Sequence, residues 1–389
     1  MSNISFLARV ILQSCLPVIK GTALFRSFNG QYNDNPKYIS EELHKREPEM
    51  KIVWAIKDGS PESFPKYVKT VEINSKEYIK YVARAEVVVD NYAGLRTNFL
   101  GENNFLKRLA FSLASRRKRG QLNISTWHGT PLKHIALDEP NYKNKSFSRA
   151  YVNADLMLAG CDVTANAYKT ALGWGKETLM CGTPRNDILF KTPKSDLKSK
   201  LGIPSDKKVI LFAPTFRNNV EMSGISQLKS LNMEKLLDTL KERFGEEWCF
   251  VFRSHNLVMS KIQDEGLKIN EDMINGNQFP DMAEYLSVAD VLLTDYSSSM
   301  FDYMLTGKPV FLYTPDLDDY KNSERGFYFE IDSTPFSISE TVDDLMDKIA
   351  KFDSKLYKEK VDDFLKKIGN VENGVASKIT VDEILKRIK

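Results

Sequence analysis

Residues 290–314, DVLLTDYSSSMFDYMLTGKPVFLYT, place a strand, a helix and a second strand one after another. The runs on either side of the helix are continuously apolar, as strands buried on both faces are. Gly307 ends the helix between them, in the position that glycine commonly takes after the last helical residue. Two strands joined by a helix form a parallel unit, so this stretch predicts an α/β fold.

The same pattern extends to both sides of this stretch. Short apolar runs alternate with helical or polar sequence at KIVWAI (51–56), EVVVDN (86–91), NISTW (123–127), DLMLAG (155–160), VILFAP (209–214) and WCFVFR (248–253). Strands that alternate with helices predict parallel sheets covered on both faces. The runs fall into two sets, which predicts two doubly wound domains facing across a cleft.

A stretch rich in Lys, Pro and Ser, KTPKSDLKSKLGIPSDKK (191–208), separates the two sets. We therefore predict an N-terminal domain over 1–190, a linker over 191–207 and a C-terminal domain over 208–389. From about residue 340 onward, amphipathic helices with Lys and Glu on the outer face are expected to complete the C-terminal domain.

Composition limits the function classes. Of 389 residues, 42% are hydrophobic and the formal charge is +3, which gives no argument for nucleic acid. The four cysteines form no CxxC pair and there are only four histidines, so no metal cluster is expected. The N-terminal run SNISFLARVILQSCLPVIKG is too short and too polar to span a bilayer. It is unlike a secretory signal and predicts a protein inside the cell, with the run forming either an interfacial helix or a core helix.

Ligands of doubly wound sheets bind beyond the carboxyl ends of the strands. In the second half, FAPTFRNN (212–219) places Thr215 and Arg217 at such an end, and FRSHN (252–256) places Arg253 and His255 at another. Residues two apart on an extended chain share one side, so Arg253 and His255 could address one anion. A structural role for the histidine stays open.

The segment TDYSSSMFD (294–302) is the most informative strand end. Ser297, Ser298 and Ser299 would offer hydroxyls, N–H groups and a helix N-terminus to a phosphate. The alternative is simple capping of the helix. The neighbouring residues Thr294, Asp295 and Asp302 complete the predicted site; the two carboxylates would brace the loop or meet a ribose or polyol hydroxyl.

In the first half, STWHGTPLKH (125–134) brings His128 to a strand end. Gly129 permits a tight turn or a close approach to a ligand, and Thr130 and Lys133 follow. A histidine there suits a general base, since its pKa lies near neutrality; a capped structural histidine is the alternative. CGTPRND (181–187) is a second such turn and offers Arg185 as a phosphate ligand.

Five motifs together resemble the CDP-glycerol glycerophosphotransferase family, the teichoic acid primases and polymerases of Gram-positive cell walls. They are WHGTPLK (127–133), GTPRND (182–187), FAPTFR (212–217), RSHN (253–256) and TDYSSSMFDYMLTGKPV (294–310), in the family's order over about 185 residues. The resemblance implies two Rossmann-like domains, as in GT-B glycosyltransferases, with a CDP-polyol donor in the C-terminal domain. It also implies an acid/base role for His128 and places His255 near the donor phosphates. The family's R-x-H is often followed by proline, where this chain has Asn256.

The resemblance implies transfer of glycerol phosphate from CDP-glycerol to an undecaprenyl-linked saccharide or a short teichoic acid chain, with release of CMP. The alternatives are a CDP-ribitol donor, a GT-B sugar-nucleotide glycosyltransferase, or a binding module without catalysis. The length of the chain favours a primase or short-chain transferase over a polymerase. No cofactor besides the donor is expected, and metal dependence and oligomeric state stay open.

The segment ENNFLKRLAFSLASRRKRG (102–120) mixes basic and apolar residues. Such a mixture suits an anionic membrane surface, which would place the protein peripherally on the cytoplasmic face. A solvated basic helix is the alternative. RNA binding is disfavoured because no aromatic-rich recognition motif accompanies the basic residues.

Overall fold

The computed structural model describes residues 3–57, 63–73, 75–91, 109, 113, 118–140, 142, 154–192, 196–215, 225–254, 273–317 and 326–389. The chain divides into two compact units. The first contains Met1–Gly129, Ile135–Asp187 and Asn370–Lys389, and the second contains Thr130–His134 and Ile188–Gly369.

The first unit is built on a seven-stranded sheet in the order β3-β2-β1-β4-β5-β6-β7. Every neighbouring pair is parallel. The strands are β1 (Ile19–Arg26), β2 (Lys51–Ile56), β3 (Lys69–Glu72), β4 (Ala85–Asp90), β5 (Leu122–Ser125), β6 (Leu156–Ala159) and β7 (Thr178–Met180). The four strands predicted in this half are confirmed as β2, β4, β5 and β6.

Strand β1 lies inside this sheet, between β2 and β4, and was not predicted. Its sequence, IKGTALFR, contains a lysine, a glycine and an arginine that interrupt the apolar pattern. Arg26 is nevertheless buried, because its guanidinium forms an ion pair of 2.6 Å with Asp90 at the end of β4. A buried charge is tolerated only when it is paired in this way.

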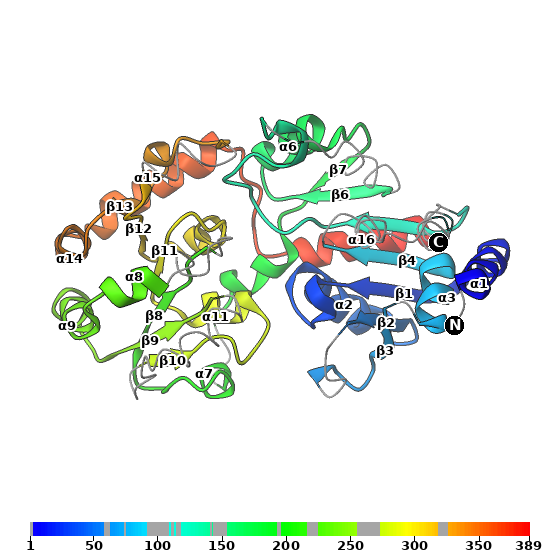
Figure 1. Ribbon diagram of the computed structural model, residues 1–389, viewed down its shortest axis with the longest axis horizontal. Coiled ribbons are helices and arrows are strands. Elements are labelled where there is room, and N and C mark those ends of the chain that lie inside the picture. Colours follow the sequence, from blue (N-terminus) through cyan, green and yellow to red (C-terminus); the bar gives the residue numbers. More distant parts are fainter. Residues whose placement is uncertain are drawn as a thin grey trace. The chain divides into compact units, whose positions relative to one another are not determined.

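Helices cover the sheet of the first unit (Figure 1). They are α1 (Asn3–Cys15), α2 (Asp34–Arg46), α3 (Lys76–Arg84), α6 (Asp162–Leu172) and α16 (Ala376–Ile388). The N-terminal run, for which a core helix and an interfacial helix were both open, forms α1. Its Val10 is buried in a cluster with α3, whereas Ile11 and Leu12 are exposed.

Helix α16 corrects the predicted domain division, which placed all of 208–389 in one domain. Figure 1 shows this helix, in red, beside the first sheet. Val381, Ile384 and Leu385 are buried in the core formed by β1, β2 and α2. Its amphipathic pattern indicated a buried face but not the sheet against which that face packs.

The start of α16 is held by Asp187, from the GTPRND motif. Its Oδ1 accepts a hydrogen bond from the N–H of Ala376 and its Oδ2 one from the N–H of Ser377, each at 2.8 Å. The first N–H groups of a helix have no partner within the helix. A buried carboxylate that receives two of them therefore fixes the helix to the first unit.

Replacing Asp187 with alanine should lower the free energy of unfolding by about 1–2 kcal/mol, the usual cost of losing a helix cap. Two buried N–H groups would lose their acceptor. Urea unfolding followed by tryptophan fluorescence measures the change, and Asp187→Asn, which retains one acceptor oxygen, should fall between the two proteins. An unchanged midpoint for Asp187→Ala would contradict this role.

The second unit is built on a six-stranded sheet in the order β10-β9-β8-β11-β12-β13, also parallel throughout. The strands are β8 (Lys208–Phe212), β9 (Trp248–Phe252), β10 (Met273–Asn275), β11 (Val291–Thr294), β12 (Val310–Tyr313) and β13 (Ser337–Ser339). The four predicted strands are confirmed as β8, β9, β11 and β12. The predicted α/β class with two doubly wound sheets is therefore confirmed.

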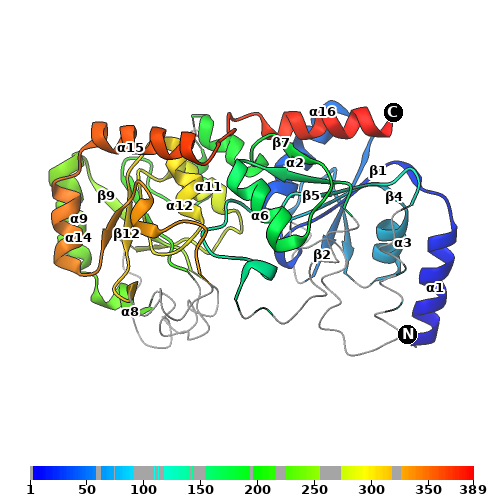
Figure 2. The same cartoon turned by 90° about the horizontal axis from the view of Figure 1, so that it is seen from above.

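The helices of the second unit are α7 (Leu197–Lys200), α8 (Ile225–Ser230), α9 (Met233–Phe244), α11 (Met282–Val288), α12 (Ser299–Tyr303), α14 (Val342–Ala350) and α15 (Ser354–Lys367). Figure 2 shows α9 beside α14, which it contacts. The predicted linker, 191–207, is partly incorrect, because Leu201 and Ile203 are buried in this unit.

Both sheets reverse their strand order at one place, between β1 and β4 in the first and between β8 and β11 in the second. Ligands of open parallel sheets bind outside the carboxyl ends of the strands at such a reversal. Site residues are therefore expected at the carboxyl ends of the strands around these two reversals. None of the helices in the described ranges is apolar enough over sufficient length to cross a membrane.

Candidate functional site

His128 lies at the reversal point of the first sheet. Strand β5 ends at Ser125, and the N–H of Thr126 donates to the carbonyl of Asp90, at the end of β4, at 2.8 Å. Trp127 and Gly129 flank the histidine with φ values of 54° and 112°. Left-handed backbone suits glycine but strains a tryptophan; strain of this kind gathers at functional sites.

The imidazole of His128 has a defined tautomer. Its Nδ1 lies 3.1 Å from the main-chain oxygen of Asn91, the residue after β4. A carbonyl only accepts, so Nδ1 carries the proton, and the neutral ring holds its lone pair on Nε2. Trp127 stacks on the ring at 4.1 Å and Phe28 meets it edge-on at 5.2 Å, which fixes its plane.

Burial lowers the pKa of His128 below its ordinary value of 6.5. The negative charge of Asp34 and the hydrogen bond to Asn91 act in the opposite direction, and the positive charge of Arg185 adds to the lowering. The ring is therefore neutral at pH 7. A neutral imidazole with a defined lone pair can take a proton from a hydroxyl.

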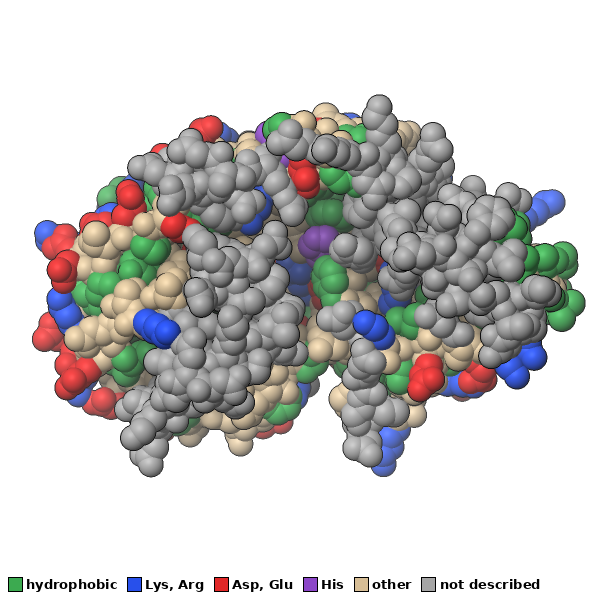
Figure 3. All heavy atoms as spheres, in the orientation of Figure 1, with side chains coloured by type: hydrophobic (Ala, Val, Ile, Leu, Met, Phe, Trp, Pro, Cys, Tyr) green, Lys and Arg blue, Asp and Glu red, His purple; other side chains and the backbone are tan. Residues whose placement is uncertain are grey.

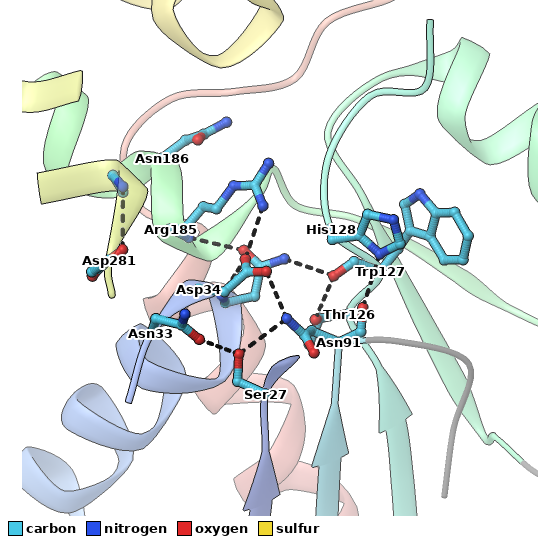
Figure 4. Close-up of polar contacts among 12 residues, drawn as sticks. Ser27, Asn33, Asp34, Asn91, Thr126, Trp127, His128, Arg185, Asn186 and Asp281 are labelled. Atoms are coloured by element: carbon cyan, nitrogen blue, oxygen red, sulfur yellow. Dashed lines mark hydrogen bonds and ion pairs between the residues drawn. The ribbon is translucent and has the colours of Figure 1, made fainter. Parts of the chain in front are cut away.

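Arg185 reaches the same site from the 3₁₀ helix Pro184–Phe190. Its guanidinium forms an ion pair of 3.0 Å with Asp34, and its main-chain N–H donates to Asn35 at 3.0 Å. Figure 4 shows Arg185, Asp34 and His128 converging above the strand ends. The structure thus brings together two of the predicted residues, His128 and Arg185.

The HGTPLK segment is divided between the two units. His128 and Gly129 belong to the first, whereas Thr130 and Lys133 belong to the second. Lys133 forms an antiparallel bridge with Phe327, and the N–H of Tyr328 donates to Leu132 at 2.8 Å. Thr130 and Lys133 therefore belong with residues 326–328.

At the reversal point of the second sheet, Thr294 and Asp295 fasten β11 to β8. The hydroxyl of Thr294 donates to the carbonyl of Ala213 at 2.7 Å. Asp295 Oδ1 accepts from the N–H of Thr215 at 2.7 Å and from that of Tyr296 at 2.6 Å. Of the two roles predicted for Asp295, these bonds correspond to bracing the loop. The second carboxylate, Asp302, is also buried.

The three serines follow directly. The hydroxyls of Ser297 and Ser299 lie 2.9 Å apart, and Ser298 is the residue before α12 but makes no side-chain capping bond. Ser297 Oγ accepts from the N–H of Ser299 at 3.4 Å, a long distance for a cap. Simple capping therefore leaves much of this hydroxyl cluster unexplained.

Arg253 holds the main chain of its own unit. Its guanidinium donates to the carbonyls of Gly276, Phe279 and Pro280, the last two at 2.7 and 2.8 Å. It also lies 5.0 Å from the ring of Tyr285, and burial lowers its pKa. Arg253 thus shapes the turn after β10 and places a positive charge there. His255 and Arg217 lie outside the described residues.

Sequence reasoning missed the residues that surround His128. They are Ser27, Asn33, Asp34, Asn35 and Asn91. Asn91 could have been found, since it ends the predicted strand EVVVDN at a sheet edge. Asp34 gave no such signal, because NDNP reads as an ordinary helix start. Within the described residues no group of three or more His, Cys, Asp or Glu side chains could hold a metal.

Comparison with known proteins gives a family over nearly the whole chain. Residues 8–386 match the family described as CDP-Glycerol:Poly(glycerophosphate) glycerophosphotransferase. The teichoic acid poly(glycerol phosphate) polymerase of Staphylococcus epidermidis is 31% identical over 95% of this chain. The chain spans 51% of that relative's length, that is, about half.

Two further comparisons cover both partners almost completely. The teichoic acid glycerol-phosphate transferase of Staphylococcus aureus is 27% identical over 94% of this chain and 93% of its own. A solved structure of the wall teichoic acid polymerase TagF is 29% identical with a TM-score of 0.79, over 98% of this chain and 94% of that one. The chain therefore belongs to the CDP-glycerol:poly(glycerophosphate) glycerophosphotransferase family.

Proposed function

We propose that this protein transfers glycerol phosphate from CDP-glycerol to a lipid-linked saccharide or a short teichoic acid chain, releasing CMP. Family membership supports the reaction class. The observation that carries the proposal is His128, a neutral imidazole with its lone pair on Nε2 at the strand-order reversal of the first sheet.

In this proposal the donor binds at the second sheet. Ser297, Ser298 and Ser299 would hydrogen-bond its phosphates, as would Thr215 at the end of β8. Arg253, after β9, would contribute a positive charge, and Arg217 and His255 follow β8 and β9 in sequence. Phosphoryl transfer depends chiefly on positioning and charge neutralisation, which these groups would provide.

The transfer step itself is an in-line displacement. The acceptor hydroxyl attacks the phosphorus that bears glycerol, and His128 Nε2 takes its proton. A new P–O bond forms to the acceptor while the bond to the bridging oxygen breaks, and that oxygen leaves with CMP. The reaction requires the donor in the second unit to meet His128 during turnover.

Mass spectrometry of products tests the proposal. A synthetic undecaprenyl-type lipid disaccharide would be offered CDP-glycerol, CDP-ribitol or a UDP-sugar in parallel. We expect a mass increase of one or a few glycerol phosphate units with CDP-glycerol and an equal amount of CMP. Ribitol phosphate addition would reassign the donor, and sugar addition or no product would overturn the proposal.

We also propose that the enzyme works on the cytoplasmic membrane face, where a lipid-linked acceptor would lie. Ile11 and Leu12 of α1 are 46% and 57% exposed, and Leu109 of the basic segment is 39% exposed. Figure 3 shows apolar side chains at the surface over α1. Lys118 joins the two elements, since its Nζ donates to the carbonyls of Gln13 and Leu16 at 2.8 Å.

Liposome sedimentation distinguishes this surface from a solvated basic helix. Neutralising Arg116, Arg117 and Arg119 should reduce binding to anionic vesicles, with each charge contributing about 1 kcal/mol. Lys118 is kept because it fastens the end of α1. Ile11→Ser with Leu12→Ser should weaken binding to anionic and neutral vesicles alike. Unchanged binding by both variants would reject this surface.

A further inference from the structure

In the turn 33–35 the carboxylate of Asp34 sits on a residue with left-handed backbone, which most side chains disfavour. Asp34 is the first residue of α2, has a φ of 58° and is buried. Few residues other than glycine adopt this conformation, although asparagine and aspartate do so more readily than most. The Asp34 side chain is therefore held in one direction by a strained start to the helix.

Asp34 receives three donors. Its Oδ1 accepts from the guanidinium of Arg185 at 3.0 Å and from the N–H of Asn35 at 2.7 Å. Its Oδ2 accepts from Nδ2 of Asn91 at 2.6 Å. Only a carboxylate can accept on both oxygens at once.

Asn91 connects this carboxylate to the imidazole. The side chain of Asn91 is bound by Asp34 and by Ser27, whose hydroxyl it approaches at 3.2 Å, while its main-chain oxygen binds His128 Nδ1. Asn91 therefore contacts Asp34 through its side chain and His128 through its main chain, so its orientation sets both contacts. Figure 4 shows the two links in sequence, Asp34 to Asn91 and Asn91 to His128.

A second branch runs through Asn35. Its Nδ2 donates to the main-chain oxygen of Trp127 at 3.0 Å, and its Oδ1 accepts from the N–H of Arg185. The strained residue before His128 and the arginine beside it are therefore held by the same turn.

We propose that Asp34 is a positioning residue for the transfer reaction: through Asn91 it holds His128 with Nδ1 protonated and Nε2 ready to accept, and it fixes Arg185 beside the ring. This inference rests on the proposed function for the role of His128 as base. The arrangement it describes is a property of the free protein and can be measured without substrate.

The charges around His128 give this role a signature. Asp34 on α2 favours the imidazolium and Arg185 on the 3₁₀ helix disfavours it, while Asp90 on β4, paired with Arg26 of β1, favours it more weakly. Removing the Asp34 charge should lower the pKa of His128, because the larger of the two negative charges that oppose Arg185 is then lost. Removing the Arg185 charge should raise it.

Asp34→Asn is the appropriate variant because asparagine also tolerates the left-handed backbone. Its amide offers one acceptor oxygen, so either Asn91 or Arg185 would face an N–H₂ group instead of an oxygen. Asp34→Gly, which relieves the backbone but removes the side chain, reports whether stability alone explains the result.

The pKa of His128 in the free protein, followed by proton–nitrogen NMR and assigned by the loss of its signal in His128→Gln, is the first measurement. We expect a fall of about half a unit to one unit in Asp34→Asn and a rise of similar size in Arg185→Gln. Nitrogen shifts should also report a loss of the Nδ1-protonated form in Asp34→Asn. Unmoved values in both variants would overturn the proposal; if Asp34→Asn fails to fold, an unmoved value in Arg185→Gln alone does so.

Kinetics provides the second measurement. In Asp34→Asn, kcat should fall about 10- to 100-fold, as when a group that orients a reacting residue is lost, with KM for CDP-glycerol nearly unchanged. The acid limb of the rate profile should move to lower pH. A wild-type protein that transfers no glycerol phosphate would defeat the proposed function and leave the NMR result standing.

Discussion

Replacing His128 with alanine should lower the turnover number by about two to four powers of ten, the usual contribution of a positioned acid or base. The acceptor hydroxyl would then lose the Nε2 lone pair that takes its proton. The ring is neutral at pH 7 because burial lowers its pKa, so the wild-type protein should keep its rate at pH 7. Its rate should fall only as the pH drops through a value under 6.5, and this limb should vanish in the variant.

The control must separate chemistry from packing, since Trp127 stacks on the His128 ring. His128→Gln fills part of the space without a base and should be as inactive as His128→Ala. His44→Ala removes another histidine of the first unit, one stacked on Tyr67, and should keep its activity. Steady-state release of CMP measures all three; near-normal turnover in His128→Ala would remove this residue from the mechanism.

Replacing Ile384 with alanine should destabilise the first unit by about 2–5 kcal/mol, the range for truncating a fully buried isoleucine. Ile384 lies in the core with Trp54 of β2 and Ile39 of α2. The loss is large because Ile384 is fully buried, so its truncation would leave a cavity in this core. Urea unfolding monitored by tryptophan fluorescence reports it, since Trp54 is part of the same cluster.

Lys386→Ala provides the matched control on the same helix. Its side chain is 77% exposed and forms a surface ion pair of 3.4 Å with Glu383. Its loss should therefore change the free energy of unfolding by less than about 0.5 kcal/mol. Equal effects of the two substitutions would show that α16 contributes helix propensity rather than core packing.

The part of the fold that sequence reveals is the part with an uninterrupted pattern. Strands such as KIVWAI and PVFLYT are continuously apolar and were predicted within a residue or two. Strand β1 was missed because an arginine is normally expected at the surface. Arg26 is buried because it pairs with Asp90, which is also buried. Periodicity reports whether a residue is buried and not what it is buried against, which is also why α16 was placed in the wrong unit.

The candidate site follows the same rule. The place of His128 could be predicted because it directly follows the apolar run NISTW, and ligands of such sheets bind beyond strand ends. The position of Asp34 depends on which loops meet at the strand-order reversal, and this is decided by sheet topology. Arg253 shows the opposite case. Its position after a strand predicts phosphate binding, but three of its N–H groups donate to main-chain carbonyls.

The return of α16 to the first sheet has a consequence for biosynthesis. Domains generally fold in order as the ribosome delivers them, the N-terminal one first. Here the core of the first unit cannot be completed until Ile188–Gly369 have been made, because α16, which contributes Val381, Ile384 and Leu385 to that core, is translated after them. Until then the apolar residues that α16 contacts in the nascent first unit stay exposed, whereas the second unit can finish folding earlier.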